Sequence, residues 1–361
     1  MIIKSLELAD FRNYESLEIS FDKGTNIFYG DNAQGKTNIL EAIYVSATTK
    51  SHKGSKDKEI IQFNKSEAHI RTYLLKDEEE IRVDMHLRGN KSKGIAIDGQ
   101  KIKKAADLMG LLNVVLFSPE DLGIIKNGPA ERRHFADMEL CQLDSFYLYN
   151  LNHYNKIINQ RNRLLKDMYM NPDLRETLNI WDSQLVSFGT KIIERRNKFA
   201  SSLCEIIYEI HKKLSGGREE LIIKYEPDVS IDDFEKVLAA NQEKDIRLKQ
   251  TSTGPHRDDF SFIVNGIDIR KYGSQGQQRT AALSLKLSEI ELVKKISRDV
   301  PVLLLDDVLS ELDSNRQNYL LNSIGNIQTI ITCTGLDEFI NNRFEINKIF
   351  KVTNGSVLCE N

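Results

Sequence analysis

The sequence predicts a mixed α/β fold in which a nucleotide-binding core lies beside an antiparallel β layer and is interrupted by a helical domain. Three observations support this prediction. The stretch "YGDNAQGKT" at 29–37 has the spacing of a phosphate-binding loop. The apolar run "VPVLLLDD" at 300–307 ends in two aspartates. Between them, from about 130 to 215, apolar residues recur at helical spacing.

The loop at 29–37 is expected to join a strand to a helix. "TNIFYG" is a short β-type run, and Ile39, Leu40 and Ile43 recur at helical spacing. In such a turn backbone N–H groups surround a phosphate, Lys36 reaches the terminal phosphates and the Thr37 hydroxyl binds Mg²⁺. A chance match to the pattern is the alternative. The expected nucleotide contacts are Gly30, Asp31, Asn32, Ala33, Gln34, Gly35, Lys36, Thr37 and Asn38.

The two aspartates that end "VPVLLLDD" form the second motif. A carboxylate at the end of a buried strand can hold the Mg²⁺ that faces a phosphate-binding loop. Asp306 is therefore the expected metal ligand, together with Thr37. Asp307 points elsewhere and is expected to orient or deprotonate the attacking water, so that Asp307 and Lys36 are the expected catalytic residues. The alternative is that the two aspartates only begin a surface turn.

Length and composition indicate two or three domains with substantial hydrophobic cores, because 40% of the 361 residues are hydrophobic. The apolar runs are far shorter than the ~18 residues of a membrane span, and the N-terminal stretch lacks the core of a signal peptide. We therefore expect a soluble, cytoplasmic protein. The widely spaced Cys141, Cys204, Cys333 and Cys359 are expected to be reduced, buried thiols.

The charge balance excludes recruitment of nucleic acid by a global basic field. Lys and Arg total 50 against 53 Asp and Glu, which gives a net charge of −3. Any such binding must use a local patch. The candidate is the polar loop "KSHKGSKDK", in which Lys50, Lys53, Lys56 and Lys58 are suited to salt-sensitive, sequence-independent phosphate contacts. The alternative is a solvated charged loop without a ligand.

The flanking regions are expected to be rich in strands. "IRVDMHL" alternates apolar and polar residues, and Asp98-Gly99 marks a turn in an antiparallel layer. "FSFIVNGIDIRKYG" is typical of a hairpin with an Asn265-Gly266 turn. A long amphipathic helix is expected at 280–296.

The middle region is expected to be an arm of antiparallel helices. One helix is marked by Tyr147, Leu151, Tyr154 and Ile158, and another continues to the "SGG" at 215–217. Asn171-Pro172 breaks the pattern between them, so each helix is expected to hold one to two dozen residues. Arg161, Arg163 and Lys166 are expected to form the exposed face of an arm helix.

A third motif begins at Tyr272 with "YGSQGQQRTAALSLKL". Ser274 and the backbone amides of a small turn open a helix there and form a second anion site in the same chain. A single phosphate-binding loop is enough to bind one nucleotide, so the chain does not need a second anion site for its own nucleotide. The second site is therefore expected to cap the terminal phosphate of a nucleotide held by another copy.

The chain resembles the ATP-binding-cassette ATPases. Ser274-Gln275-Gly276-Gln277 is similar to their signature loop, and "LSELD" is similar to their D-loop, which ends at Asp313. More narrowly, the chain resembles the RecF family, bacterial recombination and repair proteins related to SMC-type heads. The stretches that carry this resemblance span nearly the whole length and include "FRNY", "GDNAQGKTNILEAI", "PEDLGIIKNGPAERRHFAD", "TSTGPHRDD" and "LLLDDVLSELD".

The resemblance implies an SMC-type head divided into residues 1–118 and 251–361, with a helical arm domain at 119–250. It implies ATP and Mg²⁺ as cofactors, and an ATP-dependent homodimer that holds two nucleotides between its heads and binds double-stranded DNA. It also implies action with RecO and RecR in loading a recombinase at gaps, with slow hydrolysis as a release switch. Ser274, Gln275, Gly276, Gln277 and Asp313 would complete the nucleotide site.

Several positions depart from the family pattern. Asp307 stands where these ATPases usually have Glu, one methylene longer, and this fits a weak ATPase. The switch histidine expected after "QTIIT" is replaced by Cys333 or Thr334. Arg12 in "FRNY" is expected near the loop, where it would either reach the nucleotide or pair within the structure.

Three other functions compete with this interpretation. One is another SMC-like or P-loop ATPase that acts on a non-DNA substrate. Among these, a P-loop kinase or metabolic ATPase would need an acceptor-substrate pocket and would hydrolyse nucleotide without dimerising. An ATP-dependent nuclease would need an acidic catalytic domain, for which the stretch after Asp313 is too short. A purely structural head is disfavoured, because both halves of the nucleotide site are present in the sequence.

Overall fold

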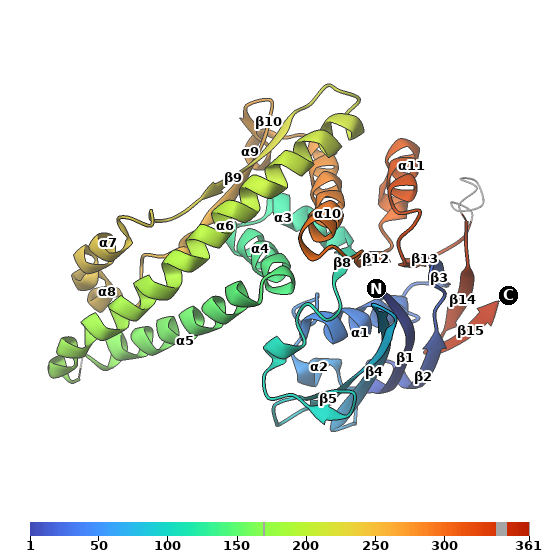
Figure 1. The fold of residues 1–361 in the computed structure, drawn as a ribbon, viewed down its shortest axis with the longest axis horizontal. Helices are drawn as coiled ribbons and strands as arrows, with labels where there is room; N and C mark the ends of the chain where they lie inside the picture. The colour runs from blue at the N-terminus through green and yellow to red at the C-terminus, as the bar shows by residue number, and fades with distance from the viewer. Residues whose placement is uncertain (169, 337–344, 361) are drawn as a thin grey trace. The chain divides into compact units, whose positions relative to one another are not determined.

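The structure is a computed structural model that describes residues 1–168, 170–336 and 345–360. The chain forms two compact units, which Figure 1 shows in one view. The first unit combines Met1–Asp121 with Glu289–Asn361, and the second is Leu122–Ser288. The first boundary lies close to the expected one, whereas the second lies later than the expected 251. Strand β10 (Asp259–Val264) pairs with β9 (Leu221–Glu226) of the second unit, and this pairing keeps the residues between them in that unit.

An antiparallel sheet of six strands, in the order β2-β1-β4-β5-β6-β7, is the expected β layer of the first unit. Apolar and polar residues alternate along its long strands, so one face is buried and the other is open to solvent. The Asp98-Gly99 turn has two positive φ angles, as a tight hairpin requires. The strands are β1 (Ile2–Phe11), β2 (Tyr14–Ser20), β4 (Glu67–Lys76), β5 (Glu79–Arg88), β6 (Gly94–Ile97) and β7 (Gln100–Lys101).

The second sheet of the first unit has the order β15-β14-β3-β13-β12-β8 and is parallel except for its edge strand β15. Every residue of β12 is buried, which explains its uninterrupted apolar sequence. The strands are β3 (Thr25–Tyr29), β8 (Val114–Phe117), β12 (Val302–Asp306), β13 (Thr329–Cys333), β14 (Lys348–Thr353) and β15 (Ser356–Glu360).

Helix α1 (Lys36–Thr48) contacts strands of both sheets, and the buried side chains of all three form one hydrophobic core. This core fixes the start of α1 against the parallel strands. Two shorter helices, α2 (Asp57–Ile60) and α11 (Ser314–Ser323), belong to the same unit.

The second unit is built on a pair of long helices, α5 (Ser145–Asp167) and α6 (Leu178–Leu214), which lie side by side in Figure 1. Asp144 caps α5 by accepting hydrogen bonds from the first backbone amides. With 37 residues, α6 exceeds the expected two dozen. Gly189 does not interrupt it, because the ring of Phe234 occupies the space that a Cβ would need.

The prediction that Arg161 lies on an exposed face of α5 is wrong. Its side chain is fully buried and forms ion pairs with Asp182 at 2.6 Å and Asp245 at 2.7 Å. Arg163 and Lys166 are exposed, as expected. Buried arginine is tolerated here because two carboxylates compensate its charge. Arg161 therefore ties α5 to α6 and α8 and is not available for a ligand.

Helix α10 (Gln275–Ser297) starts five residues earlier than expected and passes from the second unit into the first. It is buried on all sides from 280 to 290, so the expected amphipathic pattern is wrong. Ser284 and Ser288 bond to carbonyl oxygens one turn earlier. The remaining helices are α3 (Leu122–Lys126), α4 (Pro129–Leu143), α7 (Phe234–Ala240), α8 (Gln242–Leu248) and α9 (Ile269–Tyr272).

A three-stranded antiparallel sheet completes the second unit, in the order β11-β10-β9. Its strands are β9 (Leu221–Glu226), β10 (Asp259–Val264) and β11 (Ile267–Asp268). The expected hairpin at Asn265-Gly266 is confirmed, and both residues have positive φ.

Within the described residues, the helices are too short or too polar to cross a membrane. The four cysteines, all within the described residues, form no disulfide. Cys141 and Cys333 are buried as expected, but Cys204 is half-buried and Cys359 is exposed. Cys359 is exposed because it lies on the edge strand β15.

Candidate nucleotide-binding site

The predicted phosphate-binding loop connects β3 to α1, as the sequence indicates. Gly35 immediately precedes α1 with a φ of 117°, which side chains rarely adopt. A Cβ at this position would lie 2.5 Å from the Asn13 side chain and 2.8 Å from the Tyr14 hydroxyl. Glycine is therefore required here both by its backbone angle and by its neighbours.

Hydrogen bonds from two other turns, both far from the phosphate-binding loop in the sequence, support this loop. The Asn13 side chain donates to the Gln34 carbonyl at 2.9 Å, and the Tyr14 hydroxyl donates to the Gly35 carbonyl at 3.1 Å. From the β14–β15 turn, the backbone amide of Asn354 donates to Gln34 Oε1 at 2.6 Å. Sequence reasoning quoted Asn13 and Tyr14 only as part of "FRNY" and missed Asn354. No local signal marks Asn354, because its role depends on strand order.

Lys36 folds back over the loop. Its side chain is buried, and Nζ donates to the carbonyl oxygens of Gly30 at 2.5 Å and Asp31 at 2.8 Å. Both acceptors belong to the loop that is expected to hold the phosphates. An ammonium held there is positioned to neutralise the charge of a phosphate that enters the loop.

Thr37 and Asp306 are in contact. Thr37 Oγ1 donates to Asp306 Oδ1 at 2.7 Å, although 269 residues separate them. The sheet order explains this contact, because β13 lies between β3 and β12 and all three are parallel. Their carboxyl ends therefore meet at one edge. Thr332, at the end of β13, donates to the same carboxylate oxygen at 2.7 Å.

These oxygen donors suit a magnesium ion, which prefers carboxylate and hydroxyl oxygens and usually keeps several waters. Thr332 is a residue that sequence reasoning missed. The signal was available at the end of "QTIIT", but its relevance follows only when β13 is known to lie beside β12. Cys333 and Thr334, the positions expected for a switch histidine, follow directly after Thr332.

Asp307 lies beside this group in a left-handed backbone conformation, with a φ of 53°. Its backbone amide donates to the Thr332 carbonyl at 3.2 Å and to Thr332 Oγ1 at 3.1 Å. Burial raises the pKa of Asp307, and this effect exceeds the opposing influence of the Lys36 charge. A carboxylate with a raised pKa is a stronger proton acceptor than an exposed aspartate.

Arg12 donates hydrogen bonds to α1 and to the segment that follows this helix. It forms a bidentate pair with Glu41 through Nε at 2.8 Å and a terminal nitrogen at 2.7 Å, and it also donates to Ser55 and the Glu59 carbonyl. Burial alone would raise the pKa of Glu41, but hydrogen bonds from Arg12 and Ser51 outweigh it and the pKa is lowered. The structure gives Arg12 this structural pairing, and its contact with nucleotide stays a prediction.

The loop between α1 and α2 carries the four candidate lysines Lys50, Lys53, Lys56 and Lys58. All four are exposed, and their ammonium groups form no ion pair with the part of the chain that is described. His52 between them is turned inward, with its ring edge-on to Tyr44. Burial lowers the pKa of His52. The buried ring anchors a loop whose charged side chains face solvent.

The signature-like residues lie at the start of α10. Ser274 Oγ accepts a hydrogen bond from the Gln277 amide at 3.2 Å, and Gln277 Oε1 accepts one from the Ser274 amide at 2.9 Å. This reciprocal pair is a capping box. Gln275 and Gly276 are exposed and leave the turn open to solvent. Asp313 likewise caps α11 by accepting from the Arg316 amide.

A phosphate-binding loop and a carboxylate in contact across a parallel sheet, with an antiparallel sheet on the same helix, define a P-loop ATPase head of the ATP-binding-cassette type. Comparison with known proteins narrows this class. A family model described as "RecF/RecN/SMC N terminal domain" matches residues 2–357. The chain belongs to the RecF family, and the resemblance predicted from its motifs is confirmed.

Close relatives cover the whole chain. The DNA replication and repair protein RecF of Agathobacter rectalis is 65% identical over 359 residues, which are 99% of each chain. The protein of the same name from Lachnoclostridium phytofermentans is 62% identical over 357 residues, again 99% of each.

Solved structures agree with the fold. The recombination mediator protein RecF-ATP of the RecFOR pathway superposes with a TM-score of 0.93 at 35% identity, covering 99% of this chain and 97% of that one. An SMC head domain from Pyrococcus furiosus, at 18% identity, has a TM-score of 0.57 and covers 99% of this chain and 95% of that one. The second likeness shows that the SMC head shares this fold.

Proposed function

We propose that this protein binds Mg-ATP in its first unit and uses it to hold two copies together on double-stranded DNA during recombinational repair. The observation that carries the proposal is the contact between Thr37 Oγ1 and Asp306 Oδ1 at 2.7 Å. It unites the hydroxyl and the carboxylate that an Mg-nucleotide site requires. The names of the relatives and the RecF-ATP structure support the same function.

Each residue at the loop has a role in this proposal. Lys36 binds the terminal phosphates, and Thr37 and Asp306 supply oxygen ligands to Mg²⁺, which neutralises phosphate charge when bound. Asp307 accepts a proton from the attacking water. Because aspartate is one methylene shorter than the glutamate usual in this class, we propose that hydrolysis is slow and acts as a release switch.

The second half of the site is proposed to come from a second copy. The first residues of α10 are exposed, and the free backbone amides of a helix start favour an anion. Ser274 is held in place by its capping box, so the turn is already formed before a phosphate arrives. RecO and RecR are proposed partners, since the related structures belong to the RecFOR pathway.

The proposal is tested by measuring mass with light scattering, with and without ATP and Mg²⁺, in an Asp307→Asn background that slows turnover. We expect a monomer without ATP and a dimer with it. Lys36→Met should abolish ATP binding and the dimer together. Ser274→Arg should keep ATP binding and lose the dimer, because a bulky cation fills the turn that faces the partner.

Ser201→Arg is the matched control for Ser274→Arg, since Ser201 is an exposed serine on α6 of the same unit. It should dimerise like the parent. A normal dimer in Ser274→Arg would contradict the second half of the site. A monomer under all conditions would instead favour a P-loop ATPase that acts on another substrate.

A further inference from the structure

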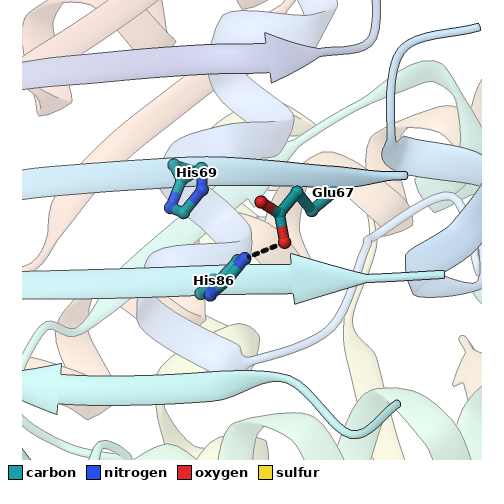
Figure 2. A group of neighbouring side chains, drawn as sticks. All are labelled: Glu67, His69 and His86. Atoms are coloured by element: carbon teal, nitrogen blue, oxygen red, sulfur yellow. Dashed lines mark hydrogen bonds and ion pairs between the residues drawn. The ribbon is translucent and has the colours of Figure 1, made fainter. Parts of the chain in front are cut away.

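The outer face of the antiparallel sheet carries a group of side chains that the nucleotide site does not use. Figure 2 shows Glu67 and His69 on β4, with His86 on the neighbouring strand β5. One ligand atom from each residue lies within 4.8 Å of the other two. All three belong to the first unit.

Strand geometry produces this group. Glu67 and His69 are two residues apart and therefore lie on the same face of β4. His69 and His86 are direct register partners in the β4–β5 ladder, and their rings stack with centroids 4.1 Å apart. Cross-strand partners are close neighbours on a sheet face. The pairing of β4 with β5 therefore keeps the three side chains close together.

The hydrogen bonds assign a proton to His86. Its Nδ1 accepts from Arg88 at 3.0 Å, so Nε2 carries the proton and donates to Glu67 Oε2 at 2.7 Å. A metal ion bound between Glu67 and His86 would replace this proton. Two imidazoles and a carboxylate are thus available as ligands.

We propose that Glu67, His69 and His86 form a binding site for a zinc-class divalent cation. Two imidazoles and one carboxylate are a donor set that zinc accepts and that magnesium and calcium do not prefer. The ligand atoms already lie within 4.8 Å of one another, and rotation of each imidazole about χ2, a torsion with a broad minimum, adjusts the direction of its nitrogens. Three protein ligands leave one position of a tetrahedral site open.

His69 and His86 also line a groove of about 560 Å³ on the same sheet face, together with Arg71, Asp84 and Lys101. A donor bound in this groove would supply the fourth ligand that a tetrahedral zinc site needs. Arg88 opposes the site in one respect. A metal at Nε2 moves the ring proton to Nδ1, where it faces the guanidinium of Arg88 and not an acceptor. Loss of that guanidinium should therefore favour the metal.

The test is a calorimetric titration of the full chain with Zn²⁺ at pH 7.5. Excess Mg²⁺ occupies Thr37 and Asp306, and a Cys359→Ser background removes the exposed thiol. We expect one Zn²⁺ per chain. His86→Ala, His69→Ala and Glu67→Gln should each weaken binding at least ~10-fold. Arg88→Gln should tighten it, because the amide oxygen can accept from Nδ1.

His153→Ala is the matched control, since His153 stacks on Phe188 in the second unit. It should bind Zn²⁺ like the parent. Circular dichroism of each variant checks that it is folded, and Zn²⁺ should raise the unfolding midpoint of the parent but not of His69→Ala/His86→Ala. Equal binding by parent and double variant would overturn the proposal, as would no binding up to about 1 mM Zn²⁺. The test needs no nucleotide, so its result is independent of the proposed ATP-driven function.

Discussion

Thr332 connects Asp306, the proposed metal ligand, to Asp307, since its hydroxyl donates to the Asp306 carboxylate and also accepts from the Asp307 amide. Replacing it with Val keeps the shape of the side chain but removes both contacts. A hydrogen bond to a charged group contributes about 1.5–3 kcal/mol. We therefore expect Thr332→Val to weaken ATP binding roughly 10-fold in Mg²⁺ and to leave Mg²⁺-free binding nearly unchanged.

Fluorescent-nucleotide titrations with and without Mg²⁺ measure this difference. Thr329→Val is the matched control, because Thr329 is a buried threonine on the same strand whose hydroxyl donates to the Ile327 carbonyl. A similar loss in both variants would mean that the strand itself, and not the Asp306 contact, is affected.

His256 provides a prediction about pH. Its Nδ1 bonds to the Tyr154 hydroxyl at 2.7 Å and its Nε2 donates to the Thr251 carbonyl at 3.1 Å. Burial lowers the pKa of His256 from 6.5 to about 4. Between these values the unfolded chain takes up a proton that the folded chain does not. Stability is therefore lost as the pH falls from 6.5 to 4, by on the order of 3 kcal/mol.

Thermal unfolding at pH 7.5 and pH 5 checks this effect. The wild type should lose more stability on acidification than His256→Gln, whose amide does not titrate. His153→Gln should follow the wild type. Parallel losses in wild type and His256→Gln would contradict the assignment.

The sequence predicts the residues of the site that lie in continuous motifs. The spacing around Lys36 and the apolar strand before Asp306 each contain their own signal. Thr332 and Asn354 do not, because a threonine at a strand end and an asparagine in a turn are common. Their roles depend on which strands are neighbours. Glu67, His69 and His86 escaped notice for the same reason, since a cross-strand pair has no fixed spacing.

At the scale of elements, the loop between α1 and α2 is the candidate contact with DNA. Each lysine that binds a phosphate contributes roughly one unit to the slope of log affinity against log salt. We expect replacement of Lys50, Lys53, Lys56 and Lys58 with Gln to weaken ATP-dependent binding to duplex DNA and to flatten this slope. Binding of ATP itself should not change.

The matched control replaces four exposed lysines of the second unit, Lys213, Lys224, Lys236 and Lys244, with Gln. This control variant loses the same number of positive charges as the first variant, but from elements other than the loop between α1 and α2. Fluorescence anisotropy with a labelled duplex at several salt concentrations measures both slopes. An equal change in the two variants would identify a general charge effect and exclude a local patch.

Sequence periodicity predicts whether most segments form a helix or a strand better than it predicts where these elements begin and end. The apolar repeat that ends at "SGG" predicts α6, yet its 37 residues exceed the expected two dozen. Likewise, α10 contains serines, a lysine and a glutamate that resemble a solvent-exposed face. They are buried in the structure, where Ser284 and Ser288 bond to carbonyl oxygens of their own helix and Lys286 lies over the Phe135 ring.

At the scale of the whole molecule, the phosphate-binding loop and the proposed metal ligands of one copy all lie in the first unit. A ligand stabilises the part of the structure that binds it. In the monomeric variant Ser274→Arg, we therefore expect ATP and Mg²⁺ to slow hydrogen exchange in the first unit and to leave α5 and α6 unchanged. In the dimerising parent, protection should extend to the start of α10.

Hydrogen exchange read by mass spectrometry distinguishes these patterns. Lys36→Met with ATP is the control and should show no protection in either unit. Protection of α5 and α6 in Ser274→Arg would show that the two units respond to nucleotide as one body, contrary to this expectation.

The turn between β14 and β15 supports the phosphate-binding loop, because Asn354 and Gly355 both donate backbone hydrogen bonds to Gln34. The loop is synthesised early, but these supports are synthesised about three hundred residues later. At the usual rate of translation, the interval is roughly 15 to 60 s. A nascent chain on the ribosome therefore carries a phosphate-binding loop without this support, which forms only after residues 354 and 355 have emerged.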